Sequence, residues 1–262
     1  SVNIVINNYY RYSPNGDNYI GQFMQKDKAL SYYKKSFDGA EKYIKKSDKS
    51  FYRIAKADNI SRNNTRNNSL VLNYNGIDSY LSVNNSKLSE FANKLNNRSF
   101  TPNSPIINFD NRSIVSNIMG VKYYIGKSSK DPHFDPSIKK IKDVGDFSIY
   151  KKENVLPMGY VYNNILDENI FDSFSGLKKE ESLAYAAAVS SEYTKSNINH
   201  INTKIKNISF NTKGSTADVK KNKVLITKAN QEVILNIKNN IIPDGELYIN
   251  KIGRAHVWTP VT

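Results

Sequence analysis

The longest unbroken apolar run in this chain is Leu183–Val189, only seven residues. A helix that crosses a bilayer needs about 20 apolar residues, so no stretch of this sequence is predicted to span a membrane. The chain has no cysteine, which excludes a disulfide framework and a thiolate metal site. We therefore expect a water-exposed fold made of short helices and strands, while the run-length test says nothing about a larger parent protein.

The composition is that of a folded protein and indicates that its gene comes from an AT-rich genome. The 262 residues are enough for one large domain or two smaller ones. Only 39% are hydrophobic, but 18 tyrosines and 11 phenylalanines can complete a core. The net charge of +14 rests on 31 lysines and 7 arginines, beside 36 asparagines. Because Asn, Lys, Ile and Tyr have AT-rich codons, we attribute much of this charge to a low-GC bacterial genome.

Up to about residue 190, helical and strand patterns alternate. Phe51–Ile54, Val121–Ile125 and Phe147–Tyr150 are predicted to pair in one sheet backed by helices, with Val121, Tyr123 and Ile125 on one face. Other expected strands are Leu70–Leu72 and Met158–Tyr162, and Lys127–Asp143 is expected to be a charged loop. The expected helices are one capped by Asp38 and ending near Ser47–Asp48, one capped by Ser86, one at Ser113–Met119 before Gly120, and one at Glu180–Val189.

From Ile201 onward the pattern changes to short strands. They are expected at Ile205–Phe210, Thr216–Lys220, Val224–Thr227, Val233–Ile237 and Leu247–Ile249. The predicted fold class is α+β: a mixed helix/sheet domain followed by an antiparallel β-sandwich-like unit that is truncated at its C-terminus. The expected domains are an irregular, partly helical segment at 1–36, an α+β extracytoplasmic domain at 37–195, the incomplete β unit at 196–251 and a tail at 252–262.

The tail Ile252–Thr262 resembles a translated sequencing adapter, residue for residue. It contains Trp258, the only tryptophan of the chain. We expect this segment to be non-native and poorly packed, and we exclude it from arguments about fold and function. Together with a start at Ser1, it suggests an internal fragment of a larger protein.

No catalytic constellation can be assembled from the residues. The one histidine near carboxylates lies in Asp131–Asp135, where Asp131, His133 and Asp135 could offer metal ligands, but a solvated loop is the better interpretation. Phosphate loops, nucleophile elbows and zinc-protease motifs are absent from the sequence. We therefore predict no catalytic, cofactor-binding or metal residues, no cofactor, and no activity of this chain by itself.

A lysine-rich stretch near the N-terminus is the main candidate binding feature. Lys26–Lys49 interleaves lysines with Tyr32, Tyr33 and Tyr43, and Phe51 follows, which is a weak signal for binding nucleic acid or another polyanion. Nucleic-acid surfaces favour arginine, which is scarce here, so a solvated surface is the more common explanation and we expect no nucleic-acid partner.

Four segments, in order, carry a family resemblance. They are Phe51–Ile54, Gly76–Asn85, Ile118–Ile125 and Ile149–Val161. Their succession resembles the extracytoplasmic region of the YfhO family of multi-spanning bacterial membrane proteins. Asn169–Val189 is also similar to the helix that follows in the family. The resemblance is good over Phe37–Val189 and loose over Ile201–Lys251. Met119 and Lys152 depart from the family pattern.

The resemblance implies the water-exposed part of a membrane glycosyltransferase. Enzymes of this kind are similar to those that transfer sugar from a polyprenyl-phosphate carrier to an envelope polymer such as teichoic acid. The implied catalytic acid lies in an early loop outside this chain, so no catalytic residue is carried over. The implied partners are the lipid-linked sugar and the anionic polymer, and the implied location is the extracytoplasmic face of the cell membrane. Two alternatives stay open: a non-catalytic cell-surface glycan-binding or adhesion module, and a basic nucleic-acid-binding protein.

Overall fold

The structure is a computed structural model of the whole chain. It describes residues 2–13, 15–16, 27–28, 31, 37–57, 60, 67–78, 85–97, 109, 112–130, 132, 134 and 137–193, and the strands at 210–213, 217–220, 223–226 and 234–237. The chain divides into two compact units, Ser1–Asn197 and Ile198–Thr262. Each unit is described by itself, and the predicted domain ranges stay a prediction.

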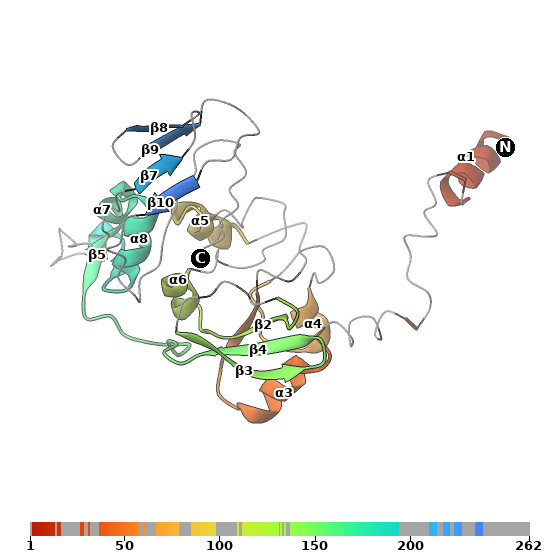
Figure 1. Cartoon of the computed structure of the whole chain (residues 1–262), viewed down its shortest axis with the longest axis horizontal. Coiled ribbons are helices and arrows are strands. Elements are labelled where there is room, and N and C mark those ends of the chain that lie inside the picture. The colour runs from red at the N-terminus through yellow and green to blue at the C-terminus, as the bar shows by residue number, and fades with distance from the viewer. Residues whose placement is uncertain are drawn as a thin grey trace. The chain divides into compact units, whose positions relative to one another are not determined.

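The centre of the first unit is a four-stranded mixed sheet in the order β1-β2-β4-β3 (Figure 1). The strands are β1 (Arg53–Lys56), β2 (Val121–Lys127), β3 (Ile138–Val144) and β4 (Phe147–Lys152). β1 pairs with β2 in parallel, and β4 pairs with both β2 and β3 in antiparallel fashion. The prediction that three of these segments share one sheet is confirmed, with β1 starting at Arg53 rather than Phe51.

Both faces of this sheet are buried over its inner part, whereas the edge strand β3 is mostly exposed. Helix α3 (Ala40–Ser47) covers one face and contributes Ala40 and Ile44 to its core. The side chains buried with them include Phe37, Tyr52, Ile54, Tyr123, Ile125 and Ile149. The opposite face buries Ala55, Val121, Tyr124 and Tyr150, with Ile77, Met119, Phe134 and Ile138 packed against them. A sheet covered on both faces explains why its strands alternate only weakly in hydropathy.

The expectation that Val121 shares a face with Tyr123 and Ile125 is wrong. Arg53 pairs with Val121, but the next residue, Ile54, pairs with Tyr123, so Lys122 is an extra residue in β2. Such a bulge reverses the alternation of side chains beyond it. Val121 therefore packs with Ala55 and Tyr124, on the side of the sheet away from α3.

Short helices and a second small sheet complete the first unit (Figure 1). The helices are α1 (Val2–Tyr12), α4 (Asn68–Leu72), α5 (Ser86–Lys94), α6 (Ser113–Ile118), α7 (Glu168–Ser173), α8 (Gly176–Leu183) and the 3₁₀ turn η2 (Ser191–Tyr193). Strands β5 (Ile165–Asp167) and β6 (Ala187–Val189) pair in parallel. The predicted helices at Ser86 and at Ser113–Met119 are confirmed. The side chain that caps α5 is Asn85 rather than Ser86, because the amide of Lys87 donates to Asn85.

Several expected elements are different in the structure. Leu70–Leu72 belongs to helix α4 between two left-handed asparagines, because a three-residue apolar run cannot distinguish a strand from a buried turn of helix. Met158–Tyr162 forms no strand. Glu180–Val189 is split between the end of α8 and strand β6, and Lys127–Asp143 contains most of β3.

The capping of α3 also differs from the prediction. Asp38 lies one residue before the N-cap position, which Gly39 occupies, and neither side chain caps the helix. The Asp38 carboxylate instead accepts a hydrogen bond from the backbone amide of Asp146 at 2.9 Å. The Asp38 carboxylate, which the sequence pattern predicted to cap the helix, therefore forms a tertiary hydrogen bond in place of the cap. The predicted end of the helix at Ser47–Asp48 is confirmed.

The second unit contains two antiparallel strand pairs. β7 (Phe210–Lys213) pairs with β10 (Ile234–Ile237), and β8 (Ala217–Lys220) pairs with β9 (Lys223–Ile226). The strand expected at Val233–Ile237 and the antiparallel pairing are confirmed, and the described part of the chain is α+β as predicted. Leu247–Ile249 and the tail 252–262 lie outside the described residues, so the sandwich-like closure and the nature of the tail stay predictions.

None of the helices in the described ranges combines the length and the apolar content that a bilayer crossing requires.

Candidate polyanion-binding face

Helix α3 is amphipathic in an unusual way, because its solvent side is almost entirely basic. Ala40, Glu41 and Ile44 are buried, as their spacing of about one helical turn requires. The exposed positions are Lys42, Tyr43, Lys45, Lys46, Ser47 and, just beyond the helix, Lys49. The apolar stripe therefore attaches α3 to the sheet and turns a row of lysines toward water.

Both ends of α3 are tied to the sheet. At the N-terminal end, Asp38 accepts from the amide of Asp146 in the turn between β3 and β4. At the C-terminal end, the carboxylate of Asp48 accepts from Lys122 Nζ at 2.6 Å and from the Tyr123 hydroxyl at 2.8 Å. Burial opposes ionisation of Asp48, but these bonds and those from Ser50 outweigh it and lower the pKa of the carboxyl below its usual value. Asp48 thus stays charged and holds the helix along the sheet.

Strand β3, at the edge of the sheet, adds lysines next to α3. Lys139 pairs with Lys151, and Lys142 pairs with Ile149, whose side chain packs on the α3 side. Residues directly opposite in an antiparallel pair project on the same face, so Lys139 and Lys142 lie on the α3 side. Strict alternation would separate them, but the register shifts between Lys140 and Lys142. The bulge at Ile141 is therefore what brings both lysines to one face.

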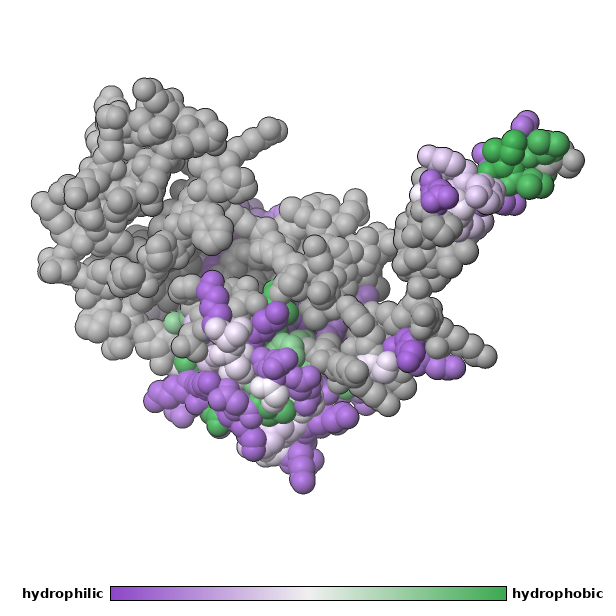
Figure 2. Space-filling model, turned by 45° about the vertical axis from the view of Figure 1, so that its right-hand side comes forward, coloured by the Kyte–Doolittle hydropathy of each residue, from purple (hydrophilic) through white to green (hydrophobic). Residues whose placement is uncertain are grey.

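The two elements meet at Tyr43. Lys142 Nζ lies 4.4 Å from the centroid of the Tyr43 ring, within the range of a cation–π interaction. We call Lys42, Tyr43, Lys46, Lys139 and Lys142 the α3–β3 basic face. Figure 2 shows hydrophilic side chains gathered over the part of the molecule where Figure 1 labels these two elements.

The lysines of this face have little acidic company in the described part of the chain, where the charge of Lys42 acts on the buried Glu41 beside it. Among the residues that the structure describes, none of its four lysines forms an ion pair, and the nearest paired lysine along β3 is Lys140, with Asp143 at 2.7 Å. Lys140 projects on the opposite side of the sheet, next to Tyr150. The face therefore carries uncompensated positive charge around one aromatic ring, which suits a ligand with negative groups and apolar ring faces.

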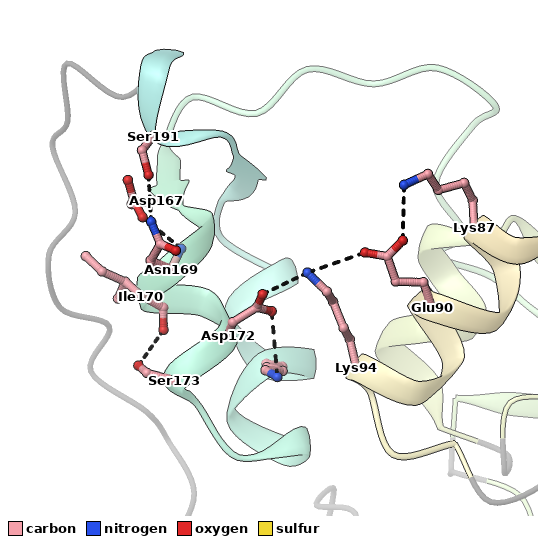
Figure 3. Close-up of polar contacts among 10 residues, drawn as sticks. Lys87, Glu90, Lys94, Asp167, Asn169, Ile170, Asp172, Ser173 and Ser191 are labelled. Atoms are coloured by element: carbon pink, nitrogen blue, oxygen red, sulfur yellow. Dashed lines mark hydrogen bonds and ion pairs between the residues drawn. The ribbon is translucent and has the colours of Figure 1, made fainter.

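A second cluster of charges, between α5, α7 and α8, by contrast combines lysines with carboxylates (Figure 3). Lys94 on α5 reaches Asp172 on α7 at 2.8 Å and Glu90 at 3.8 Å, and Lys179 on α8 reaches Asp172 at 3.8 Å. Lys87 pairs with Glu90 at 3.1 Å. The three lysines share the two carboxylates of Glu90 and Asp172, so the cluster joins three helices and attracts an external anion less than lysines without ion pairs do.

Two further ion pairs are buried and structural. Lys56 Nζ lies 2.6 Å from Asp78, with 7% and 4% of the two side chains exposed. Burial lowers the pKa of Lys56 and raises the pKa of Asp78, and the ion pair opposes both shifts. Arg112 and Glu180 approach to 3.2 Å and join the start of α6 to α8. Neither pair can reach a large ligand, so we assign both to the stability of the fold.

The structure brings together only some of the residues that the sequence suggested for metal or polyanion binding. Asp131, His133 and Asp135 lie outside the described residues, as do Lys26, Tyr32, Tyr33 and His200. In the described ranges, no cluster of three potential metal ligands occurs. Tyr43 does belong to the basic face. Phe51 is exposed but lies under Arg53, whose guanidinium is 5.1 Å from its ring.

Sequence reasoning missed the β3 half of the face. The apolar residues of this segment are Ile138, Ile141 and Val144. They are three residues apart, whereas a regular half-buried strand has apolar residues two apart, so the pattern did not predict a strand. The bulge at Ile141 explains the spacing, since it adds one residue to a two-residue repeat. The lysines of this segment were the one other indication of a strand in the sequence, because edge strands commonly carry lysine.

Comparison with known protein families identifies one that this chain matches. A family model described as "Bacterial membrane protein YfhO" matches residues 1–257. Comparisons with curated proteins and with solved structures found no match. The family match covers nearly the whole sequence, and it agrees with the four segments that carry the resemblance. The chain therefore belongs to the YfhO family of bacterial membrane proteins.

Proposed function

We propose that this chain holds an anionic envelope polymer, such as teichoic acid, at the extracytoplasmic face of a membrane glycosyltransferase. The α3–β3 basic face is the observation that carries the proposal, because it combines an exposed tyrosine ring, 4.4 Å from Lys142 Nζ, with four lysines that form no ion pair among the described residues. The sugar donor in this proposal is a polyprenyl-phosphate carrier. The donor and the catalytic acid belong to parts of the enzyme outside this chain.

The chemistry of the face fits a polymer of phosphates and sugars. Lysine ammonium groups are compact point charges that attract phosphate without demanding a fixed bidentate geometry. An exposed aromatic ring offers a flat apolar surface to the face of a sugar. A flexible polymer that alternates the two groups can use both at once. A duplex nucleic acid would gain most from arginine forks, and the face contains none.

The location and the transfer reaction rest on the family. Membership in a family of bacterial membrane proteins supports association with the membrane. The resemblance to polyprenyl-phosphate-dependent enzymes supports transfer of a sugar on the outer side. A cell-surface adhesion module could use the same face without catalysis, so the decisive experiment must measure transfer as well as binding.

The test compares two double variants with equal loss of charge. Lys46→Gln/Lys142→Gln removes two lysines of the basic face, one of which lies over an aromatic ring. Lys87→Gln/Lys178→Gln removes two lysines elsewhere, one of which also lies over a ring, that of Phe174 at 4.1 Å. Each variant lowers the net charge from +14 by two, to +12.

Membranes from cells that express the complete gene are supplied with labelled polyprenyl-phosphate sugar and purified teichoic acid. The face variant should raise KM for the polymer about tenfold, since each lysine near an anionic surface contributes about 1 kcal/mol before screening by salt. The control variant should match the wild type. Absence of labelled polymer with the wild type would favour the adhesion module, and equal KM values for both variants would remove the basic face from the proposal.

A further inference from the structure

Three segments that are distant in the sequence meet on the surface at Gly120. A Cβ placed on Gly120 would lie 3.7 Å from a ring carbon of Phe51, from the guanidinium of Arg53 and from the carbonyl oxygen of Leu156. Phe51 and Leu156 are 39% and 37% exposed. These residues belong to three of the four segments that carry the family resemblance, and the α3–β3 basic face includes none of them. The proposed binding of polymer therefore leaves this part of the surface without a role.

The loop that contains Leu156 presents apolar side chains to water. It links β4 to β5 and contains neither helix nor strand (Figure 1). From Asn154 to Asn164 it has no charged residue, and Met158 and Val161 are 72% and 90% exposed. An exposure of 90% leaves almost no protein around a side chain, so this part of the loop protrudes from the surface. We call residues 156–161 the apolar loop tip.

Both ends of the apolar loop tip are held by the rest of the first unit. At one end, the carbonyl of Leu156 lies beside Gly120. At the other end, the Tyr162 hydroxyl donates to the carbonyl of Leu183 at 2.6 Å, and the Tyr162 ring packs edge to face with Tyr160 at a centroid distance of 5.3 Å. Exposed apolar residues on a loop that is fixed in this way normally mark an interaction surface.

Arg53 adds an available positive charge beside the apolar loop tip. Among the described residues it forms no ion pair, and its guanidinium donates one hydrogen bond, to the carbonyl of Met119. The guanidinium also lies 5.1 Å from the centroid of the Phe51 ring. A guanidinium has five N–H donors and a planar shape that matches phosphate, so the remaining donors can bind one. An apolar tip beside such a cation complements a phospholipid surface, which offers phosphates above acyl chains.

The shape and composition of the tip favour a lipid bilayer over a protein groove. A protruding apolar loop needs a matching cavity in a protein partner, whereas fluid lipid adapts to its shape. Tyr160 and Tyr162 flank Val161. Tyrosine concentrates at the boundary between headgroups and acyl chains, because its ring is apolar and its hydroxyl is polar. Membership in a family of bacterial membrane proteins puts a bilayer within reach of this chain.

We infer that the apolar loop tip inserts into the surface of a lipid bilayer, with Met158 and Val161 among the upper parts of the acyl chains and Arg53 at the phosphates. The insertion is shallow, because backbone groups outside helices and strands would lose their hydrogen bonds to water in the hydrocarbon core. This contact goes beyond the proposed binding of polymer and does not depend on it. It rests on apolar burial and on lipid phosphates, which zwitterionic phosphatidylcholine also provides.

Tryptophan reporters in the full 262-residue chain test the insertion. Trp258→Phe first removes the only natural tryptophan. Met158→Trp then reports the tip, and Leu70→Trp, at an apolar position of α4 that is 79% exposed, is the matched control. With vesicles of phosphatidylcholine alone, emission from Met158→Trp should shift to the blue. Bromine near the glycerol end of the acyl chains should quench it more than bromine near the methyl end, whereas emission from Leu70→Trp should not change.

Vesicle sedimentation measures what each part contributes to binding. Met158→Asp/Val161→Asp should weaken binding to phosphatidylcholine vesicles about tenfold or more, because it places two charges in the apolar part of the contact. Leu70→Asp/Tyr193→Asp adds the same charge at positions that are 79% and 70% exposed, and it should bind as the wild type does. Arg53→Gln should weaken binding, and Arg53→Lys, which keeps the charge, should weaken it less. Equal binding of Arg53→Gln and the wild type would remove Arg53 from the contact.

Other results would overturn insertion of the tip itself. Unchanged emission of Met158→Trp with vesicles would mean that the tip stays in water, and an equal shift of Leu70→Trp would mean adsorption without a preferred site. Blue-shifted emission of Met158→Trp before vesicles are added would mean that protein already covers the tip. Equal weakening by both aspartate variants would mean that charge alone sets the binding. Lys46→Gln/Lys142→Gln should bind these vesicles normally, which separates a failure of this inference from a failure of the basic face.

Discussion

Lys142 Nζ lies 4.4 Å from the centre of the Tyr43 ring, which joins the edge strand β3 to helix α3 across 99 residues of sequence, from 43 to 142. The contact depends on the bulge at Ile141, which turns Lys142 toward the helix. It also places an aromatic ring on the same face as lysines that form no ion pair with any residue the structure describes. The relationship therefore belongs both to the fold and to the proposed binding of polymer.

Tyr43 should contribute a ring face to the bound polymer. Tyr43→Phe keeps the ring and should bind a glycosylated glycerol-phosphate polymer almost as well as the wild type does. Tyr43→Leu should weaken binding by about 3- to 10-fold, the equivalent of one aromatic contact. Calorimetric titration of both variants measures the difference, and a polymer without sugar should not distinguish them. Equal affinity of both variants for the glycosylated polymer would limit the role of Tyr43 to positioning Lys142.

The buried pair of Lys56 and Asp78 should be costly to break. Asp78→Asn removes the carboxylate charge that lies 2.6 Å from Lys56 Nζ, in an interior where 7% of the lysine side chain is exposed. The free energy of unfolding should fall by about 3–5 kcal/mol, as measured by urea denaturation. Lys87→Gln, which breaks an ion pair with 85% and 50% exposed side chains, should cost at most about 0.5 kcal/mol. Similar small losses for both would mean that water reaches Lys56.

Glu41 should make the protein less stable as the pH rises. Its side chain is buried, both carboxylate oxygens lack a hydrogen-bond partner among the described residues, and burial raises its pKa above the ordinary value of 4.5. The folded state therefore binds a proton more tightly than the unfolded state does. Stability contributed by the protonated form is fully present below 4.5 and is lost as the pH rises through the higher folded pKa.

Glu41→Gln removes this titration. The variant should gain stability relative to the wild type as the pH rises above 4.5, while below that value the two should differ little. Urea denaturation of both proteins over a pH series gives the difference directly, and other titrating groups cancel in it. A difference that stays constant over the series would show that Glu41 is solvated in the folded protein.

Gly145 should tolerate alanine less well than Gly39 does. Both have left-handed backbones, with φ of +56° and +90°, so alanine should cost about 1 kcal/mol at either position. A Cβ on Gly145 would also lie 2.8 Å from the Cβ of Asp38 and would disturb the Asp38–Asp146 hydrogen bond, whereas the space around Gly39 is open. Thermal denaturation should show a loss about 1–3 kcal/mol larger for Gly145→Ala. Equal losses would deny that Asp38 anchors α3 at this turn.

The parts of the fold that followed from the sequence are those in which local pattern and tertiary packing agree. The strands at Val121–Ile125 and Phe147–Tyr150 have enough apolar and aromatic residues to predict a shared sheet, and Gly120 ends the preceding helix as expected. The pattern failed where a bulge interrupts it. At Lys122 a bulge reversed the face of Val121, and at Ile141 a bulge hid the strand that completes the basic face.

Other features depend on partners that are distant in the sequence. The ion pair between Lys56 and Asp78 spans 22 residues, and the hydrogen bond from Asp146 to Asp38 spans 108. Local propensity contains no information on such contacts. It assigned Asp38 to a helix cap for that reason. The solvent side of α3 was visible in the sequence as lysines around Tyr43, but the strand beside it was not.

Polymer binding at the α3–β3 basic face is measured most directly as the affinity of the purified 262-residue chain for a glycerol-phosphate polymer, over a series of salt concentrations. Lys46→Gln/Lys142→Gln should weaken binding about tenfold at low salt and should reduce the salt dependence of the affinity, because two charge contacts are lost. Lys87→Gln/Lys178→Gln, with the same net charge of +12, that is +14 less two, should bind as the wild type does. If both variants weaken binding equally, overall charge and not the α3–β3 basic face attracts the polymer, which would contradict binding at this face.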